Sequence, residues 1–273
     1  MLGIMVLVLL VAAVVANVVN GKKGAGGYFK GGRPETWLIT LALIAVVLGL
    51  AGYAAHQRWD GIFIDRENRV SLARFQLIVW TLLLVSALLT AGLNNAVKPP
   101  APSPLAIRIP PKIWALLGLG AFTAVSAPAI AEGLRIPAAN VAVACPPGGP
   151  GGTVGSSAAD RRVSAELDAF QTSQNLSARP CFDGRVLVKN SPADARWSDL
   201  VLGDYQGFRY VDVSKLQQLA FTLLLISVYG MALRVRMAGT DPIQEFPDVD
   251  TGFVALLALS HGAYLADKQF ALT

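Results

Sequence analysis

The sequence predicts an all-α, multi-pass membrane protein of about six transmembrane helices with a small extramembrane insert. Its 273 residues are 53% hydrophobic and 15% charged, whereas soluble domains carry about 25% charged residues. The mean hydropathy is +0.50. Several apolar runs approach the length of about 20 residues that crosses a bilayer. Four of these runs lie in a sequence repeat, which predicts a tandem parallel duplication of a helix-hairpin unit.

The predicted spans are apolar runs that contain no Asp, Glu, Lys or Arg. The first run has no basic segment before it, so a retained helix is favoured over a cleaved signal peptide. The last run is short and is bounded by Asp250 and Asp267. The six runs are Leu2–Val19, Trp37–Ala55, Phe75–Leu93, Ile113–Ala131, Leu216–Leu233 and Thr251–Ala266.

The repeat is clearest where Arg74–Ser86 aligns without a gap with Lys215–Ser227. Leucine matches between membrane helices are common by chance, but matches of polar residues are not. Polar side chains inside a bilayer pair across helices, so we expect interhelical contacts at the matched glutamines and threonines, and at the glutamines above all. The matched polar pairs are Gln76 with Gln217, Thr81 with Thr222, and Ser86 with Ser227.

The repeat extends backwards from these helices. Ser71 and Asp212 precede them, and both residue types cap helix N-termini well. Further back, Trp59 and Trp197 each open a short apolar run followed by an acid and a turn. We call such a segment a ledge and expect it to lie at the membrane surface, because tryptophan rings prefer the interface. Arg74 and Lys215 are expected to anchor the same surface by reaching the head groups.

The repeat and the insert divide the chain into four parts. Residues 1–58 carry two N-terminal helices, 59–131 form repeat copy A, 132–196 form the insert and 197–273 form copy B. In the insert, a short helix is expected near Ser164–Gln174 and a strand near Phe182–Val188.

The insert holds both cysteines of the chain, Cys145 and Cys181. Disulfides persist in oxidising compartments, so this placement favours a disulfide and an extracytoplasmic insert. Two unpaired thiols are the alternative. With the N-terminus outside, the inner loops carry slightly more Lys and Arg than the outer segments, which agrees with that orientation. The repeated phrases resemble those of bacterial membrane proteins, which implies a bacterial inner membrane as the location and nothing about function.

The net charge of +5 is explained by loop cations beside anionic lipid head groups. The sequence has no basic patch interleaved with aromatic residues, which is the pattern that would indicate binding to nucleic acid. The sequence has no catalytic or phosphate-binding motif and no metal-ligand spacing, and it implies no cofactor. The most enzyme-like residues are Ser260 and His261, for which helix packing is the favoured interpretation.

Three functions therefore stay open. The favoured one is a non-catalytic anchor, scaffold or accessory subunit, whose partners are the bilayer and other membrane subunits or copies of itself. The first alternative is an oligomeric channel or small transporter, since some transporters are built from parallel repeats. The second alternative is a membrane enzyme or cofactor-binding subunit that uses His261.

Overall fold

The computed structural model describes residues 33–97, 103–134, 143–144, 153–154, 158–183, 185–205, 208–239 and 241–270. The predicted first span, Leu2–Val19, lies outside these residues. Within them, four helices are long and apolar enough to cross a membrane, which supports a multi-pass membrane protein. These helices are α2 (Arg33–His56), α3 (Leu72–Val97), α4 (Pro111–Leu134) and α6 (Val213–Ala238).

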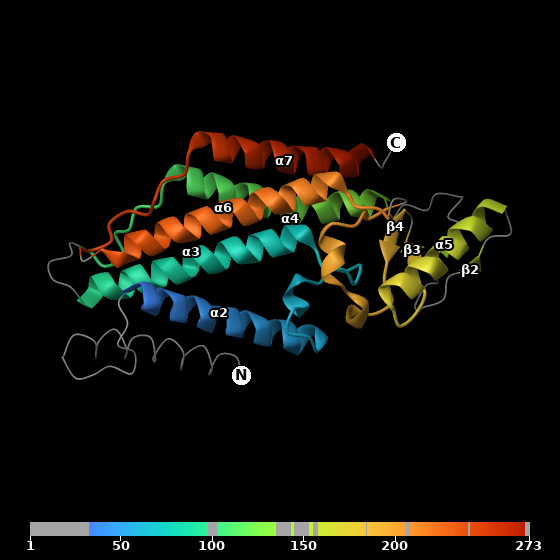
Figure 1. Cartoon of the computed structure of the whole chain (residues 1–273), viewed down its shortest axis with the longest axis horizontal. Coiled ribbons are helices and arrows are strands. Elements are labelled where there is room, and N and C mark those ends of the chain that lie inside the picture. The colour runs from blue at the N-terminus through green and yellow to red at the C-terminus, as the bar shows by residue number, and fades with distance from the viewer. Residues whose placement is uncertain are drawn as a thin grey trace.

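The predicted last span is helix α7 (Thr251–Phe270), which is not among those four. It nevertheless lies alongside them in one bundle, where it contacts α4 and α6. Figure 1 shows the five long helices side by side and a small lobe at one end of the bundle. We call this the lobe end and the opposite one the far end. Both α3 and α6 start at the lobe end, whereas α4 and α7 return to it (Figure 1).

The bundle core is apolar and continuous between α2, α3, α4, α6 and α7. Trp80, Leu84 and Leu233 are buried in it, and the indole of Trp37 donates a hydrogen bond of 3.0 Å to Ser86 Oγ. Since lipid tails are as apolar as these side chains, close packing and such interhelical hydrogen bonds hold membrane helices together.

The first ledge (residues 59–71) turns the chain between α2 and α3. It contains the short 3-10 helix η1 (Gly61–Phe63) and a bridge between Ile64 and Val70. The ledge lies directly against the end of α2. A Cβ atom at Gly52 would be 2.7 Å from the backbone nitrogen of Ile62, so only glycine permits this approach of helix and ledge.

The second ledge (residues 197–212) repeats this order of elements before α6. It contains η3 (Trp197–Leu200) and a bridge between Leu202 and Val211. The two ledges pack on each other at the lobe end, where the rings of Phe63 and Trp197 are 5.5 Å apart between centroids. Ile64, Val70 and Leu200 are buried in the same small apolar cluster.

At the far end, the connectors before α4 and α7 also pair with each other. The backbone N–H of Arg108 donates to the Gln244 carbonyl at 2.7 Å, and that of Phe246 donates to the Arg108 carbonyl at 3.0 Å. This bridge is parallel. Asn95 adds two hydrogen bonds of 2.8 and 2.9 Å to the backbone of Ile243. The hairpin of α3 and α4 is thus joined to the hairpin of α6 and α7 at both ends of the bundle.

The lobe combines helix α5 (Ala158–Gln174) with a small sheet of strand order β2-β1-β3-β4. The helix extends the predicted one by a turn and a half at its start, and the predicted strand is a hairpin of β3 and β4. Leu167, Phe170 and Phe208 fill the lobe core. The strands are β1 (Val143–Ala144), β2 (Thr153–Val154), β3 (Cys181–Asp183) and β4 (Val186–Val188). The short helix η2 (Pro192–Asp194) follows.

The predicted disulfide involves one residue outside the described part of the chain. Strand β1 pairs with β3 in parallel, with Ala144 opposite Phe182. Each of these residues is the chain neighbour of a cysteine, Cys145 and Cys181. Because Cys145 is not described, the disulfide stays a prediction.

Candidate functional site

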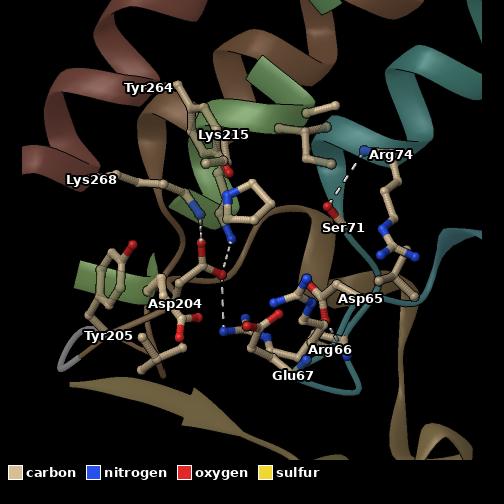
Figure 2. A pocket seen from close by; sticks show the side chains of 18 residues that line it. Asp65, Arg66, Glu67, Ser71, Arg74, Asp204, Tyr205, Lys215, Tyr264 and Lys268 are labelled. Atoms are coloured by element: carbon tan, nitrogen blue, oxygen red, sulfur yellow. Dashed lines mark hydrogen bonds and ion pairs between the residues drawn. The ribbon is translucent and has the colours of Figure 1, made fainter. Parts of the chain in front are cut away.

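An ionic cluster at the lobe end joins both ledges, the lobe and two long helices. Its first centre is the carboxylate of Asp204, in the second ledge. The ammonium groups of Lys215 and Lys268 lie 2.5 and 2.8 Å from its oxygens, and Arg69 Nη1 lies 3.1 Å away. Figure 2 shows the contacts of this carboxylate with the cations around it. These cations come from α6, α7 and the first ledge, so Asp204 joins the helix that follows its own ledge to two elements that are distant in sequence.

The second centre is Asp199, whose side chain is fully buried. Lys189, equally buried at the end of β4, donates to both of its oxygens at 2.8 and 3.0 Å. Arg69 Nε lies 3.8 Å from the same carboxylate. The backbone N–H groups of Arg196 and Val70 also donate to it, at 2.9 and 3.3 Å. A buried ion pair persists only where such additional hydrogen bonds satisfy its remaining atoms.

The two carboxylates are shared among four cations, and Arg69 connects them. Its Nη2 donates to the Gly203 carbonyl at 2.8 Å, while its Nε and Nη1 make no hydrogen bond. Burial opposes the charge of Asp204, but the charges of Lys215, Lys268 and Arg69 lower its pKa far below the ordinary value. Burial lowers the pKa of Lys189, and the Asp199 charge opposes that shift.

Asp65, in the first ledge, has the opposite electrostatic environment. Burial and the neighbouring Glu67 charge raise the pKa of Asp65 to about 7. Its Oδ1 accepts the backbone N–H groups of Glu67 and Arg69, both at 3.0 Å, which fixes the turn. Asp65 and Asp204 therefore respond in opposite directions to pH, although both lie near Arg69.

A cavity of about 140 Å³ opens beside the Asp204 centre. Figure 2 shows its labelled residues, with Tyr205, Lys268 and Tyr264 on one side and Arg66 and Glu67 on another. The ammonium of Lys268 lies 5.0 Å from the ring centroid of Tyr264 and 5.8 Å from that of Tyr205. The charged lining residues are Asp65, Arg66, Glu67, Arg69, Arg74, Glu132, Asp204, Lys215 and Lys268.

A chain of uncharged polar side chains continues from this end into the bundle. Gln218 Nε2 donates to Gln76 Oε1 at 2.9 Å, and Gln76 Nε2 donates to Thr222 Oγ1 at 2.5 Å. His261 Nδ1 lies 3.1 Å from Gln218 Nε2 and 2.5 Å from Thr123 Oγ1. One network thus links α3, α6, α7 and α4.

Beyond Thr222 the centre of the bundle is an apolar layer. Trp80, Leu83, Leu225 and Tyr229 are buried there, and the rings of Trp80 and Tyr229 lie 6.0 Å apart between centroids. Among the described residues, the hydrogen bonds of the network do not extend through this layer. The polar chain is therefore a contact between helices at one level of the bundle.

Only some of the residues predicted to make interhelical contacts make them in the structure. Gln76, Thr222 and His261 belong to the network, and Ser260 is buried beside it with no hydrogen bond to its hydroxyl. Thr81 is exposed and donates to the Leu77 carbonyl of its own helix at 2.7 Å. Gln217 is exposed as well, and its neighbour Gln218 makes the contact. One residue turns a helix by about 100°, which separates these two glutamines.

The predicted interface anchors also differ from one another. Trp59 and Trp197 are 60% and 49% exposed at the lobe end. Arg74 is exposed and donates to the Ile64 carbonyl at 2.6 Å. The prediction that Lys215 reaches the head groups was wrong. Lys215 is 3% exposed, and its ammonium is bound by Asp204.

The two predicted caps have different geometry. Asp212 is the N-cap of α6, and its carboxylate accepts the Lys215 N–H at 3.1 Å. Ser71 precedes α3, but its hydroxyl is 3.5 Å from the Arg74 nitrogen, at the limit of a hydrogen bond.

Nothing in this geometry defines a known class of enzyme. The part of the chain that the structure describes contains no group of three metal-binding side chains. Comparisons with protein-family models, with curated proteins and with solved structures found no match. The candidate site is thus the ionic cluster with its cavity. Sequence reasoning singled out three of its residues for other roles, Ser71 as a cap and Arg74 and Lys215 as anchors, and it missed the cluster itself.

Proposed function

We propose that this chain is a non-catalytic integral membrane protein that acts as an anchor or accessory subunit of a larger membrane assembly. One observation carries the proposal: the buried ionic cluster fastens the lobe to the ends of the helices. Lys189 of the lobe is paired with Asp199 at 2.8 Å, and both are fully buried. Breaking such a pair leaves a buried charge, which costs about 3–5 kcal/mol.

A second set of contacts holds the segment between lobe and ledges. Arg58 Nη1 donates to the carbonyls of Pro192, Ala193 and Ala195 at 3.0–3.1 Å. The same guanidinium forms an ion pair of 2.7 Å with Asp60. The lobe consequently has a fixed orientation relative to the bundle. A rigid platform is what a subunit needs to present a surface to a partner.

The proposal includes six spans and a tandem duplication of the ledge and its helix pair. Three features support it. Both ledges have the same order of elements, both lie at the lobe end (Figure 1), and the far-end connectors pair in parallel. We place the N-terminus and the lobe outside a bacterial inner membrane, where Cys145 and Cys181 form a disulfide.

The topology is tested with reporters fused after residue 270. The proposal predicts that alkaline phosphatase fused there is active in a bacterial host, because it needs an oxidising compartment, and that green fluorescent protein stays dark. The same reporters fused after Gly239, at the far end, serve as the control and should give the opposite result. Reporters that agree at both positions would reject the topology.

The function is tested by isolating the full chain in a mild detergent after chemical cross-linking in the membrane. The expected result is one or more partner proteins in stoichiometric amounts, with cross-links to the lobe. Conductance of the purified protein in liposomes would instead support the channel alternative. The apolar layer around Trp80 and Leu225 is evidence against a route through a single bundle. A monomer with neither partner nor conductance would overturn both proposals.

A further inference from the structure

We propose that the cavity beside Asp204 binds a singly charged phosphate ester, either the head group of a phospholipid or a soluble molecule with the same group. The cavity lies at the lobe end, where α3 and α6 begin, and measures about 140 Å³. This is beyond the anchoring function above and does not depend on it. Three features of the cavity support it: its donors, its wall towards the bundle, and its carboxylates.

The first feature is the set of donors around the cavity. Arg69 is 3% exposed, and its Nη1 and Nε are directed at the carboxylates of Asp204 and Asp199, at 3.1 and 3.8 Å. Lys268 has three N–H groups; it contacts Asp204 at 2.8 Å and also bonds the Tyr264 hydroxyl. The hydroxyl of Tyr205 is buried in the cavity wall without a partner. A buried hydroxyl without a partner carries an uncompensated desolvation penalty, which a bound anion would relieve.

The second feature is the shape of the wall. Ser71 and Leu72 line the cavity at the start of α3, so the positive end of a long helix faces the same space as the cations. Ala124, Ala127 and Pro128 of α4 form an apolar side. A phosphate ester has a charged group and an organic substituent, and this cavity offers a surface for each.

The third feature is the balance of charge. Arg66, exposed on the cavity rim, adds a cation that the cluster does not use. The carboxylate of Asp204 is already shared by three cations, and that of Asp65 accepts two backbone N–H groups. Glu67 and Glu132 also line the cavity. Their presence disfavours a dianion, so the geometry points to a diester with one negative charge.

The test measures binding to the full chain in a neutral detergent by calorimetry. The probes are short-chain phosphatidylglycerol, the matching diacylglycerol without phosphate, and the glycerol phosphate diester without acyl chains. Phosphatidylglycerol is expected to bind and diacylglycerol is not. Preferential binding of glycerol phosphate diesters without acyl chains would identify a soluble source for the same group.

Two variants keep the test independent of folding. Tyr205→Phe removes an unpartnered hydroxyl, and Arg66→Gln removes an exposed charge, so neither should lower thermal stability. Each is expected to weaken phosphatidylglycerol binding about tenfold, the effect of one hydrogen bond to a charged group. Arg108→Gln, at the far end and 71% exposed, is the control and should bind like the wild type. Equal affinity in all four proteins, or no binding of any phosphate probe, would overturn the proposal.

Discussion

The two ledges share one order of backbone elements, but the ion pairs between them join a buried cation of the first ledge to buried carboxylates of the second. Each consists of a 3-10 helix and a single β-bridge before a long helix. The first contributes the buried cation Arg69, and the second contributes the buried carboxylates Asp199 and Asp204. Two copies of the first ledge could not pair in this way, because each would bring a buried guanidinium without a carboxylate from the other. The difference shows that similar frames can form a specific contact once their charges are complementary.

The largest expected effect comes from removing the charge that the second ledge supplies. Asp199→Asn leaves the ammonium of Lys189 buried without a carboxylate, so the free energy of unfolding should fall by about 3–5 kcal/mol. Thermal unfolding in detergent, followed by tryptophan fluorescence, measures the change. Asp248→Asn breaks the exposed pair with Lys112 at the far end and should leave the midpoint unchanged. Equal midpoints for the two variants would show that the ledges do not depend on this charge.

A smaller effect concerns pH and distinguishes the carboxylates of the two ledges. The pKa of Asp65 is raised from 3.8 to about 7, so the native state holds this proton more tightly than the unfolded state. Its contribution to stability is complete below pH 4 and is lost as the pH rises to about 7. Asp65→Asn should abolish that loss, which we expect to be about 2 kcal/mol after discounting for partial solvent exposure.

Asp204 is expected to give the opposite dependence of stability on pH in the same experiment. Its lowered pKa gives stability that is present above pH 4 and decreases as the pH falls below the ordinary value of 3.8. Unfolding midpoints measured from pH 3 to pH 8 report on both carboxylates. If wild type and Asp65→Asn had parallel profiles between pH 4 and pH 7, the contrast between the two ledges would be incorrect.

The helices that follow the ledges permit a matched comparison of adjacent residues. Gln218→Leu removes the hydrogen bond to Gln76 and the contact with His261, so the free energy of unfolding should fall by about 1 kcal/mol. Gln217→Leu changes an exposed residue and should be neutral. The same unfolding measurement tests both variants, and the reverse order of effects would show that α6 is rotated.

The smallest expected effect is at the two caps. Asp212→Ala removes an acceptor 3.1 Å from the Lys215 N–H and should cost about 0.5–1 kcal/mol. Ser71→Ala removes a hydroxyl 3.5 Å from its donor and should cost less. Hydrogen exchange at the first amides of α3 and α6 resolves such local changes. Equal losses would mean that the two helix starts are equivalent.

The apolar runs predicted the long helices well, because about 20 consecutive apolar residues have few alternatives to a helix. The aligned segments predicted a ledge before each of two long helices, and a 3-10 helix with a β-bridge precedes both α3 and α6. The alignment could not indicate which residues face each other, since it matches equivalent positions and not contacts. Gln217 matches Gln76 in sequence, yet Gln218 is the residue that touches it.

The ionic cluster was harder to predict because its members have ordinary local signals. Lys189 ends a short strand and Lys268 ends a helix, positions where lysines are usually solvated. Their partners Asp199 and Asp204 lie elsewhere in the chain, and no spacing rule joins them. Only the tertiary structure makes these side chains interdependent. The one sequence signal that points to the cluster is a charge at the end of an apolar element, beside a ledge.

The distance along the chain between Arg69 and its carboxylates also constrains synthesis. Gly203, to which Arg69 donates, is 134 residues further on. At about 5–20 residues per second, a ribosome needs roughly 7–27 s to make that stretch. During this time the guanidinium has neither Asp199 nor Asp204 beside it. Its place just before α3, and not within the apolar span, lets the first hairpin enter the bilayer while this group is still hydrated.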